Sequence, residues 1–219
     1  MKKIPLIIVA GPTASGKTQL SIELAKQLDG EIISCDSMQI YKYMDIGTAK
    51  PTEAEKCGIV HHLMDFKDPA ENFSVAEYCE CAKPIIEDIY SRKKLPIIVG
   101  GTGLYMDSLA QSVDFGENDK NEELTARFLA LAETDGNEKV WEMLNQVDPG
   151  TAQKYHPNNI RRIVRALEFY YSTGMTISEY AKLPKESPYH TIYFCIDWDR
   201  EILYKRIDQR VDRMLSQGL

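Results

Sequence analysis

The sequence has no apolar run that approaches the roughly 20 residues of a membrane-spanning helix. Its first residues, Met1-Lys2-Lys3, lead into a β-rich run and not into a signal peptide with a small-residue cleavage site. The five cysteines are odd in number and contain no C-x-x-C pair, which argues against a disulfide framework and against a zinc site. These absences favour a cytoplasmic protein with reduced thiols and no membrane association.

The composition is that of an ordinary globular protein. Of the 219 residues, 43% are hydrophobic and 27% are charged, which suits one domain with an insertion or two small domains. The net charge of −7 argues weakly against nucleic acid. Between positions 154 and 165, however, the charged residues are Lys154, Arg161, Arg162 and Arg165, with no acid among them. A basic stripe of this kind can bind phosphates even on an acidic protein.

A complete phosphate-loop motif, G-x-x-x-x-G-K-[ST], occupies residues 11–18. Its members are Gly11, Pro12, Thr13, Ala14, Ser15, Gly16, Lys17 and Thr18. The pattern predicts a buried strand at 4–10 before the motif and a helix at 19–28 after it. In that setting backbone N–H groups converge on phosphate oxygens, Lys17 adds a mobile cation, and Thr18 offers a hydroxyl to Mg²⁺. The motif does not distinguish a nucleoside triphosphate such as ATP from a monophosphate substrate or pyrophosphate.

Short apolar strands alternate with helices along most of the chain. Strands at 31–35, 95–99 and 190–196 would join the one at 4–10. This alternation predicts an α/β fold, a parallel sheet of the P-loop NTPase type with helices on both faces. Ligands of such sheets lie at the carboxyl ends of the strands, which is where Asp36 follows its strand.

A block that reads entirely as helix, residues 122–165, interrupts this alternation. A helical block between strands of an α/β sheet is typical of an inserted subdomain. We expect this subdomain at residues 114–188, within a catalytic core formed by residues 1–113 and 189–219.

Two helices of the core carry further expectations. Ser74 and Glu77 form a capping box, and Pro84 should kink or restart the helix that follows. The last helix should have an apolar face made of Ile202, Leu203, Ile207, Val211 and Met214.

Six short stretches of the sequence are informative as a set, in the order in which they occur. They are GPTASGKT at 11–18, DSMQIY at 36–41, MDIGTAKP at 44–51, HHL at 61–63, GGTGLY at 100–105 and RRIVRALE at 161–168. In this order they closely resemble the bacterial tRNA dimethylallyltransferases, also called tRNA isopentenyltransferases or the IPP transferase family. The resemblance covers essentially the whole chain.

The resemblance implies an activity: transfer of a dimethylallyl group from dimethylallyl diphosphate to N6 of the adenosine 3′ of the anticodon in tRNA. It also implies that the phosphate loop binds a diphosphate leaving group instead of ATP. The family normally continues past the last predicted helix, so we expect a C-terminally truncated chain that lacks further tRNA-contacting segments.

The acceptor chemistry agrees with the resemblance. An adenine N6 amine is a poor nucleophile, so a base that takes its proton would help. Asp36 is our candidate for this general base; alternatively it caps the next helix or holds Mg²⁺ through water. The resemblance assigns Thr102 to the target nucleotide, although a threonine in a glycine turn can simply be a cap. Ser37, Met38 and Gln39 would hold the extruded adenosine.

On the donor side, negative charge grows on the diphosphate as the C–O bond breaks. Lys17, the loop N–H groups, Mg²⁺ on Thr18 and an arginine would stabilise this charge. Arg200 and Arg206 match two arginines that the family uses near the diphosphate and tRNA; a solvated helix face is the other interpretation.

The inserted subdomain should bind the anticodon stem-loop of tRNA. Arg161, Arg162 and Arg165 would grip phosphates, and their neighbours Ile163 and Val164 belong to the same expected contact stretch. The alternative is a helix with one basic surface stripe. We expect a monomer.

Two other functions fit parts of the sequence. A small-molecule or nucleoside monophosphate kinase would share the phosphate loop and an arginine-rich lid, but the helical block is long for a lid. A non-catalytic module could use the phosphate loop as a switch and the arginine stripe to hold RNA.

Overall fold

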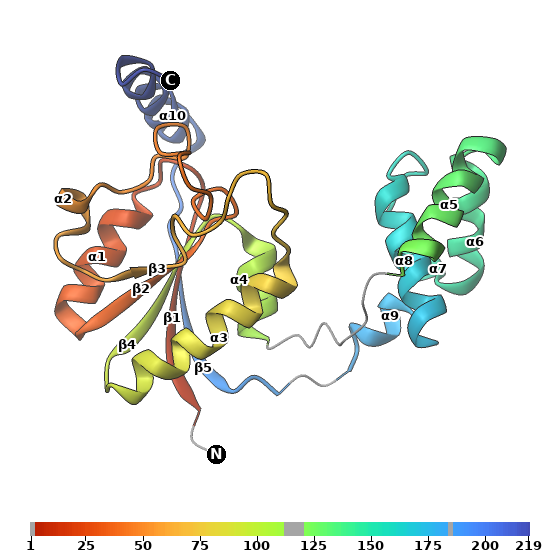
Figure 1. Ribbon diagram of the computed structural model, residues 1–219, viewed down its shortest axis with the longest axis horizontal. Coiled ribbons are helices and arrows are strands. Elements are labelled where there is room, and N and C mark those ends of the chain that lie inside the picture. Colours follow the sequence, from red (N-terminus) through yellow and green to blue (C-terminus); the bar gives the residue numbers. More distant parts are fainter. Residues whose placement is uncertain (1–2, 112–120, 184–185) are drawn as a thin grey trace. The chain divides into compact units, whose positions relative to one another are not determined.

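A computed structural model describes residues 3–111, 121–183 and 186–219. The chain divides into two compact units (Figure 1). The first, the core unit, comprises Met1–Val113 and Glu186–Leu219, and the second, the helical unit, comprises Asp114–Lys185.

The core unit is built on a five-stranded parallel sheet with the order β3-β2-β4-β1-β5. The strands are β1 (Ile4–Ala10), β2 (Gly30–Cys35), β3 (His61–His62), β4 (Leu95–Gly100) and β5 (Tyr189–Cys195). The four predicted strands are confirmed, and His61–His62 adds a two-residue edge strand. The fold is therefore the expected α/β class.

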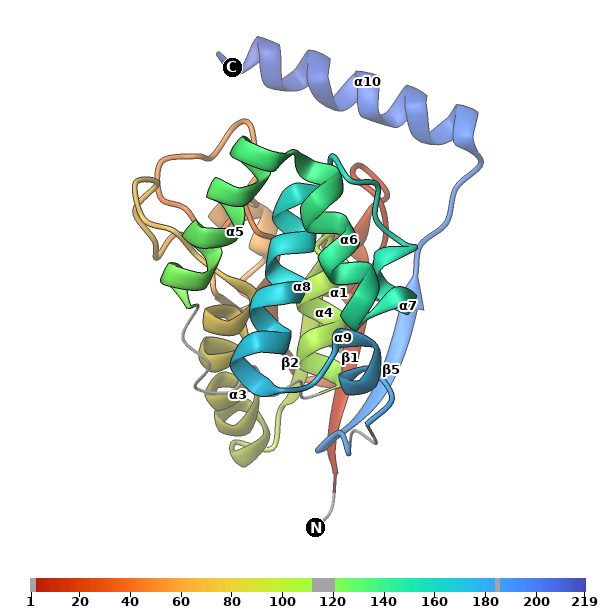
Figure 2. The same cartoon turned by 90° about the vertical axis from the view of Figure 1, so that its right-hand side faces the viewer.

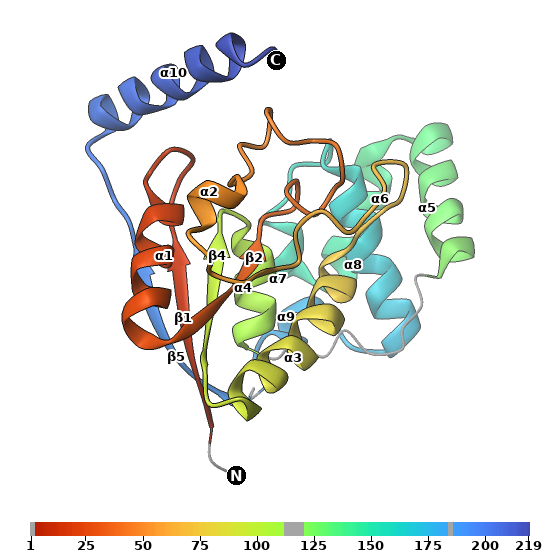
Figure 3. The ribbon, with the colours of Figure 1, turned by 60° about the vertical axis from the view of Figure 1, so that its left-hand side comes forward.

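Helices lie on both sides of this sheet, with α1 on one side and α3 and α4 on the other (Figures 1 and 3). The helices of the core unit are α1 (Lys17–Leu28), α2 (Glu53–Lys56), α3 (Val75–Ser91), α4 (Gly103–Ala110) and α10 (Arg200–Ser216). Ile7 and Ile32 pack with Ile22 of α1, whereas Ile8 and Ile33, one residue along each strand, are buried towards the opposite face. Strands β1, β2 and β4 are buried over most of their length, as expected of strands that are covered on both faces. The edge strand β5 is largely exposed, including Ile192 and Tyr193.

Helix α3 begins as the sequence predicts and runs through the proline at which a kink or a restart was expected. Ser74 accepts a hydrogen bond from Glu77 N–H and Glu77 accepts one from Ser74 N–H, which completes the capping box. Pro84 lies inside the helix, which does not restart there. Buried residues on both sides of the proline, including Tyr78 and Ile89, anchor the two halves in the same core, and this packing outweighs the local preference.

The helical unit has its own core. Its helices are α5 (Glu122–Asp135), α6 (Asn137–Val147), α7 (Pro149–Ala152), α8 (Ile160–Thr173) and α9 (Ile177–Tyr180). Helices α5, α6 and α8 pack side by side (Figure 2), and Phe128, Leu144 and Leu167 are buried between them. This core is separate from that of the sheet.

The apolar face predicted for α10 is only partly covered. Met214 is buried and Leu203 and Ile207 are half-buried, but Ile202 and Val211 are each 43% exposed. Among the described helices none is long and apolar enough to span a membrane, and all five cysteines are free thiols.

A buried carboxylate ties the amino end of β2 to the end of α3. The Glu31 side chain is 3% exposed, and its oxygens accept hydrogen bonds from Arg92 at 2.5 and 2.8 Å and from His62 Nε2 at 2.8 Å. Lys94 Nζ lies 3.0 Å from Oε1. The Arg92 bonds hold the pKa of the Glu31 carboxyl well below its ordinary value of 4.5.

We expect Glu31→Gln to lower the free energy of unfolding by about 2 kcal/mol at neutral pH, because it removes the buried partner of these cations. Since the folded-state pKa of Glu31 is depressed, its contribution is complete above pH 4.5 and is lost as the pH falls through lower values. Urea unfolding between pH 7 and pH 3 measures both effects. Glu23→Gln, which removes an exposed partner of Lys26, should change stability by less than about 0.5 kcal/mol; equal losses in the two variants would contradict this account.

Candidate active site

The phosphate loop connects β1 to α1 at the carboxyl end of the sheet. Gly16 caps the helix with φ +102°, and Ala14 also has a positive φ of 61°. Left-handed backbone of this kind lets a loop turn tightly at the helix N-terminus, where backbone donors and the helix dipole favour an anion. Ser15 Oγ is buried in the loop and has no hydrogen-bond partner among the described residues. This hydroxyl can therefore still form a hydrogen bond with a ligand.

Lys17 lies folded back over its own loop. Its Nζ donates to Gly11 O at 2.9 Å and to Pro12 O at 2.7 Å. Burial lowers the pKa of the ammonium, an effect that Asp36 opposes and Arg210 reinforces. A phosphate oxygen is a stronger acceptor than these carbonyls, so the lysine can transfer its hydrogen bonds to a ligand.

Asp36 directly follows β2 and forms a local turn. Its Oδ1 accepts hydrogen bonds from Met38 N–H at 2.9 Å and, more weakly, from Gln39 N–H at 3.4 Å. This is the capping interpretation of the residue, but among the described residues it engages only one of the two carboxylate oxygens. Within that part of the chain, Asp36 Oδ2 can accept a further hydrogen bond or a proton.

The glycine turn after β4 is bonded to the turn that Asp36 forms. Thr102 Oγ1 accepts a hydrogen bond from Ser37 N–H at 3.1 Å. A Cβ atom on Gly100 would lie 1.9 Å from Cys35 O, so only glycine permits this approach of β4 to the end of β2. The two motifs that the sequence separates by more than sixty residues are thus adjacent.

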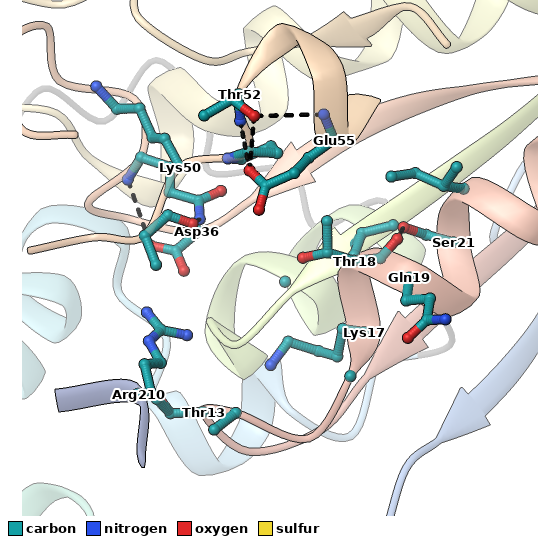
Figure 4. A pocket seen from close by; sticks show the side chains of 18 of the residues that line it. Thr13, Lys17, Thr18, Gln19, Ser21, Asp36, Lys50, Thr52, Glu55 and Arg210 are labelled. Atoms are coloured by element: carbon teal, nitrogen blue, oxygen red, sulfur yellow. Dashed lines mark hydrogen bonds between the residues drawn. The ribbon is translucent and has the colours of Figure 1, made fainter. Parts of the chain in front are cut away.

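Helix α10 brings arginines to this end of the sheet. Arg206 Nε donates to Ala14 O at 2.7 Å, and Arg210 Nη2 donates to Thr48 O at 3.2 Å. Burial lowers the pKa of the Arg210 guanidinium, and Asp36 counteracts this. Figure 4 shows the side chains of Asp36 and Arg210 pointing toward one another, with the Lys17 amine directed into the same space.

A cavity of about 1040 Å³ joins these groups within the core unit. Its lining includes loop residues 13–18, Asp36, Gln39, Gly100, Arg206 and Arg210. Arg200, which we expected to bind the donor, is exposed and lies outside this lining. Arg210 was missed by the sequence analysis, although its position four residues after Arg206 places both on one helix face.

The loop after Asp36 is closed by its own polar side chains. Gln39 Nε2 donates to Thr48 O at 3.2 Å and to Ala49 O at 3.4 Å. Lys50 Nζ donates to Tyr41 O at 2.6 Å and pairs with Asp45 and Asp65. The Gln39 amide, which we expected to hold adenosine, therefore stabilises the loop. Met38, for which we expected the same role, is 45% exposed.

The chemistry of the lining suits a hydrated Mg²⁺ next to a phosphate. The exposed Thr18 hydroxyl lies at the cavity beside the loop. Among the described residues no cluster of three or more His, Cys, Asp or Glu could form a metal cage. A magnesium ion that keeps several waters and binds ligand phosphates needs only one or two protein oxygens.

In the helical unit, two of the three arginines in the basic stretch of α8 already contact another side chain. Arg165 pairs with the buried Glu168 carboxylate, and the Arg162 guanidinium lies 5.8 Å from the Tyr155 ring centroid. Arg161 is exposed.

The expected contact stretch needs one correction. Ile163 is 0% exposed and Val164 is 2% exposed. Both side chains belong to the core of the helical unit. They therefore support α8 and offer no side-chain surface to tRNA.

The fold and the loop define a protein of the P-loop class whose anion site has a carboxylate beside it. The family model for IPP transferases matches residues 39–219. The chain belongs to this family.

Relatives agree with this assignment. The chain is 50% identical to the tRNA dimethylallyltransferase of Lachnoclostridium phytofermentans over 98% of its length and 51% identical to that of Alkaliphilus oremlandii over its full length. It spans 69% and 70% of these proteins.

Solved structures are similar as well. One is the full-length tRNA isopentenylpyrophosphate transferase of Bacillus halodurans, with 42% identity, a TM-score of 0.66, and coverage of 99% of this chain and 67% of that one. Another is a eukaryotic dimethylallyltransferase acting on tRNA, with 38% identity, a TM-score of 0.86, and coverage of 98% of this chain and 54% of that one.

We expect Lys17→Met to weaken binding of pyrophosphate, measured by calorimetry with Mg²⁺, by at least about tenfold. Charge-assisted hydrogen bonds are worth about 1.5–3 kcal/mol, and the methionine keeps only the apolar stem. Lys26→Met, near the other end of α1 and paired with exposed Glu23, is the matched control. Unchanged affinity in Lys17→Met would show that the loop does not bind this anion through its lysine.

Proposed function

We propose that the chain transfers a dimethylallyl group from dimethylallyl diphosphate to N6 of the adenosine 3′ of the anticodon in tRNA. The observation that carries this proposal is a carboxylate with one unengaged oxygen in the same cavity as a phosphate loop. An alkyl transfer from a diphosphate needs both: an anion site for the leaving group and a proton acceptor for the amine. The family membership supports the same reaction.

On the donor side, the C–O bond breaks and both of its electrons leave with the diphosphate. Lys17 and the loop N–H groups would hold the departing oxygens, with the cations of α10 nearby. Arg210 takes part here in place of Arg200, because Arg210 lies at the cavity. Thr18 would hold Mg²⁺, which neutralises diphosphate charge when bound.

On the acceptor side, the N6 lone pair forms the new C–N bond and the amine loses a proton. Asp36 Oδ2 would accept this proton while Oδ1 keeps the turn in place. Thr102 acts through Ser37, since its hydroxyl oxygen holds the Ser37 N–H. In this arrangement Thr102 positions the turn and Asp36 is the catalytic base.

The helical unit would contact the anticodon stem-loop through Arg161, which is exposed and forms no ion pair with another described residue. We further propose that the protein acts as a monomer in the cytoplasm, a location that its five free cysteines support. Nothing in this reaction requires ATP.

We expect Asp36→Asn to lower kcat by about a hundredfold or more, the usual effect of losing a positioned base. Asparagine retains Oδ1 for the Met38 N–H, so the turn and the fold should persist. The measurement is transfer of radiolabel from dimethylallyl diphosphate into an anticodon stem-loop RNA with Mg²⁺.

Asp68→Asn is the control, because Asp68 forms a similar turn with Ala70 N–H at 2.9 Å outside the cavity lining. Its rate should equal that of the unchanged protein. Transfer at the normal rate by Asp36→Asn would remove the base from this mechanism. Absence of transfer by the unchanged protein, with phosphorylation of a small molecule from ATP instead, would replace the proposal with a kinase.

We expect Arg161→Gln to raise the KM for the RNA and to reduce the slope of log affinity against log salt by about one, as for loss of one phosphate contact. Arg165→Gln should change the slope less, because Glu168 already neutralises that guanidinium. Filter binding at several salt concentrations separates the two. Equal slopes for both variants would contradict this assignment.

A further inference from the structure

Two side chains from the C-terminal part of the core unit bond to consecutive carbonyls of the phosphate loop. Trp198 Nε1 donates to Ser15 O at 2.9 Å, and Arg206 Nε donates to Ala14 O at 2.7 Å. The Arg206 guanidinium also lies 4.8 Å from the Trp198 ring centroid. We call Trp198 and Arg206 the loop clamp.

The loop clamp sets the direction of one backbone N–H group that can bind a ligand, that of Gly16. In a trans peptide the C=O and the N–H of one unit point in opposite directions, and the chain has no cis bond among the described residues. Holding Ser15 O from the side of Trp198 therefore turns the Gly16 N–H to the opposite side. Gly16 lines the cavity and caps α1, so its N–H is one of the donors that a phosphate loop offers.

The loop needs such support because part of it is strained. Ala14 has a φ of 61°, which costs a non-glycine residue of the order of 1 kcal/mol. No sequence-local partner among the described residues bonds to Ala14 O; Arg206 does. Without the clamp, the unliganded loop could relax to other backbone conformations, and binding would have to restore the original one.

The tryptophan ring also orients the arginine. A guanidinium over an indole ring is held by cation–π attraction. Among the described residues, only Nε of Arg206 has a hydrogen-bond acceptor, so its other nitrogens can bind a ligand at the loop. Arg206 Nη2 lies 3.7 Å from where a Cβ on Gly16 would be. One arginine can thus bond the loop through Nε and a phosphate through Nη2.

We propose that Trp198 is a positioning residue for diphosphate binding, acting through the Ser15–Gly16 peptide and through Arg206. The inference rests on the proposed function only for the identity of the diphosphate. It predicts an effect on binding of the anion that does not require prenyl transfer.

The direct test is calorimetric titration of the full chain with Mg²⁺ and inorganic pyrophosphate. Trp198→Phe keeps a ring for Arg206 and removes the indole donor, so we expect about three- to tenfold weaker binding, the worth of one neutral hydrogen bond. Trp198→Ala removes the ring as well and should bind more weakly than Trp198→Phe.

Trp141→Phe is the matched control. Trp141 is the other tryptophan of the chain, and its Nε1 also donates to backbone carbonyls, Ala152 O at 3.0 Å and Tyr155 O at 2.9 Å, but in the helical unit. It should bind pyrophosphate like the unchanged protein. Urea unfolding of each variant separates loss of affinity from loss of fold.

The kinetic readout distinguishes positioning from general stability. Trp198→Phe should raise the KM for dimethylallyl diphosphate by the same factor as the pyrophosphate Kd and leave the KM for RNA unchanged. A folded Trp198→Phe with unchanged pyrophosphate affinity would overturn the inference, as would failure of the unchanged protein to bind pyrophosphate. Weakened pyrophosphate binding without any prenyl transfer would support the inference while overturning the proposed function.

Discussion

The site depends on one constraint: a loop that turns its N–H groups toward an anion must find donors for the carbonyls on its other side. Arg206 donates to Ala14 O and Trp198 donates to Ser15 O. Lys17 donates to Gly11 O and Pro12 O only until a ligand takes over its hydrogen bonds. The lasting support of the loop therefore comes from the C-terminal part of the core unit. The binding conformation of the loop is therefore a property of the folded core unit and not of the motif alone.

The order of the strands determines what the loop can react with. Because β4 lies between β1 and β2, the glycine turn after β4 lies beside both the phosphate loop and Asp36. The register of Cys35 with Gly100 and the absence of a side chain at Gly100 allow this close approach. A parallel sheet places all of these strand ends at one edge, so the phosphate loop, the glycine turn and Asp36 meet there as a direct result of the strand order.

Local signals made much of this arrangement predictable. The strand, loop and first helix follow from apolar runs, glycines and the spacing of Lys17, and the α3 capping box follows from Ser74 and Glu77. Contacts between distant residues gave no such signal. Trp198 lies 183 positions from Ser15. Burial gave no signal either: the three-residue spacing of Arg165 and Glu168 allows an ion pair, but it does not reveal that the carboxylate is buried. Pro84 is the opposite case: of the two expected outcomes, the restart does not occur, because packing on both sides of the proline keeps the helix continuous.

The charges at the cavity favour a ligand with more than one negative charge. Lys17 and Arg210 are both buried enough to lower their pKa values, and both use backbone carbonyls as acceptors. Desolvated cations bonded to neutral acceptors gain free energy when phosphate oxygens replace those acceptors. A single carboxylate, Asp36, faces both cations and can offset only one charge. Arg206 is a further cation in the same cavity lining, so two of these three positive charges remain after Asp36 is counted. A diphosphate can compensate both of them, whereas a monoanion compensates only one, and these charges therefore favour a diphosphate over a simple anion.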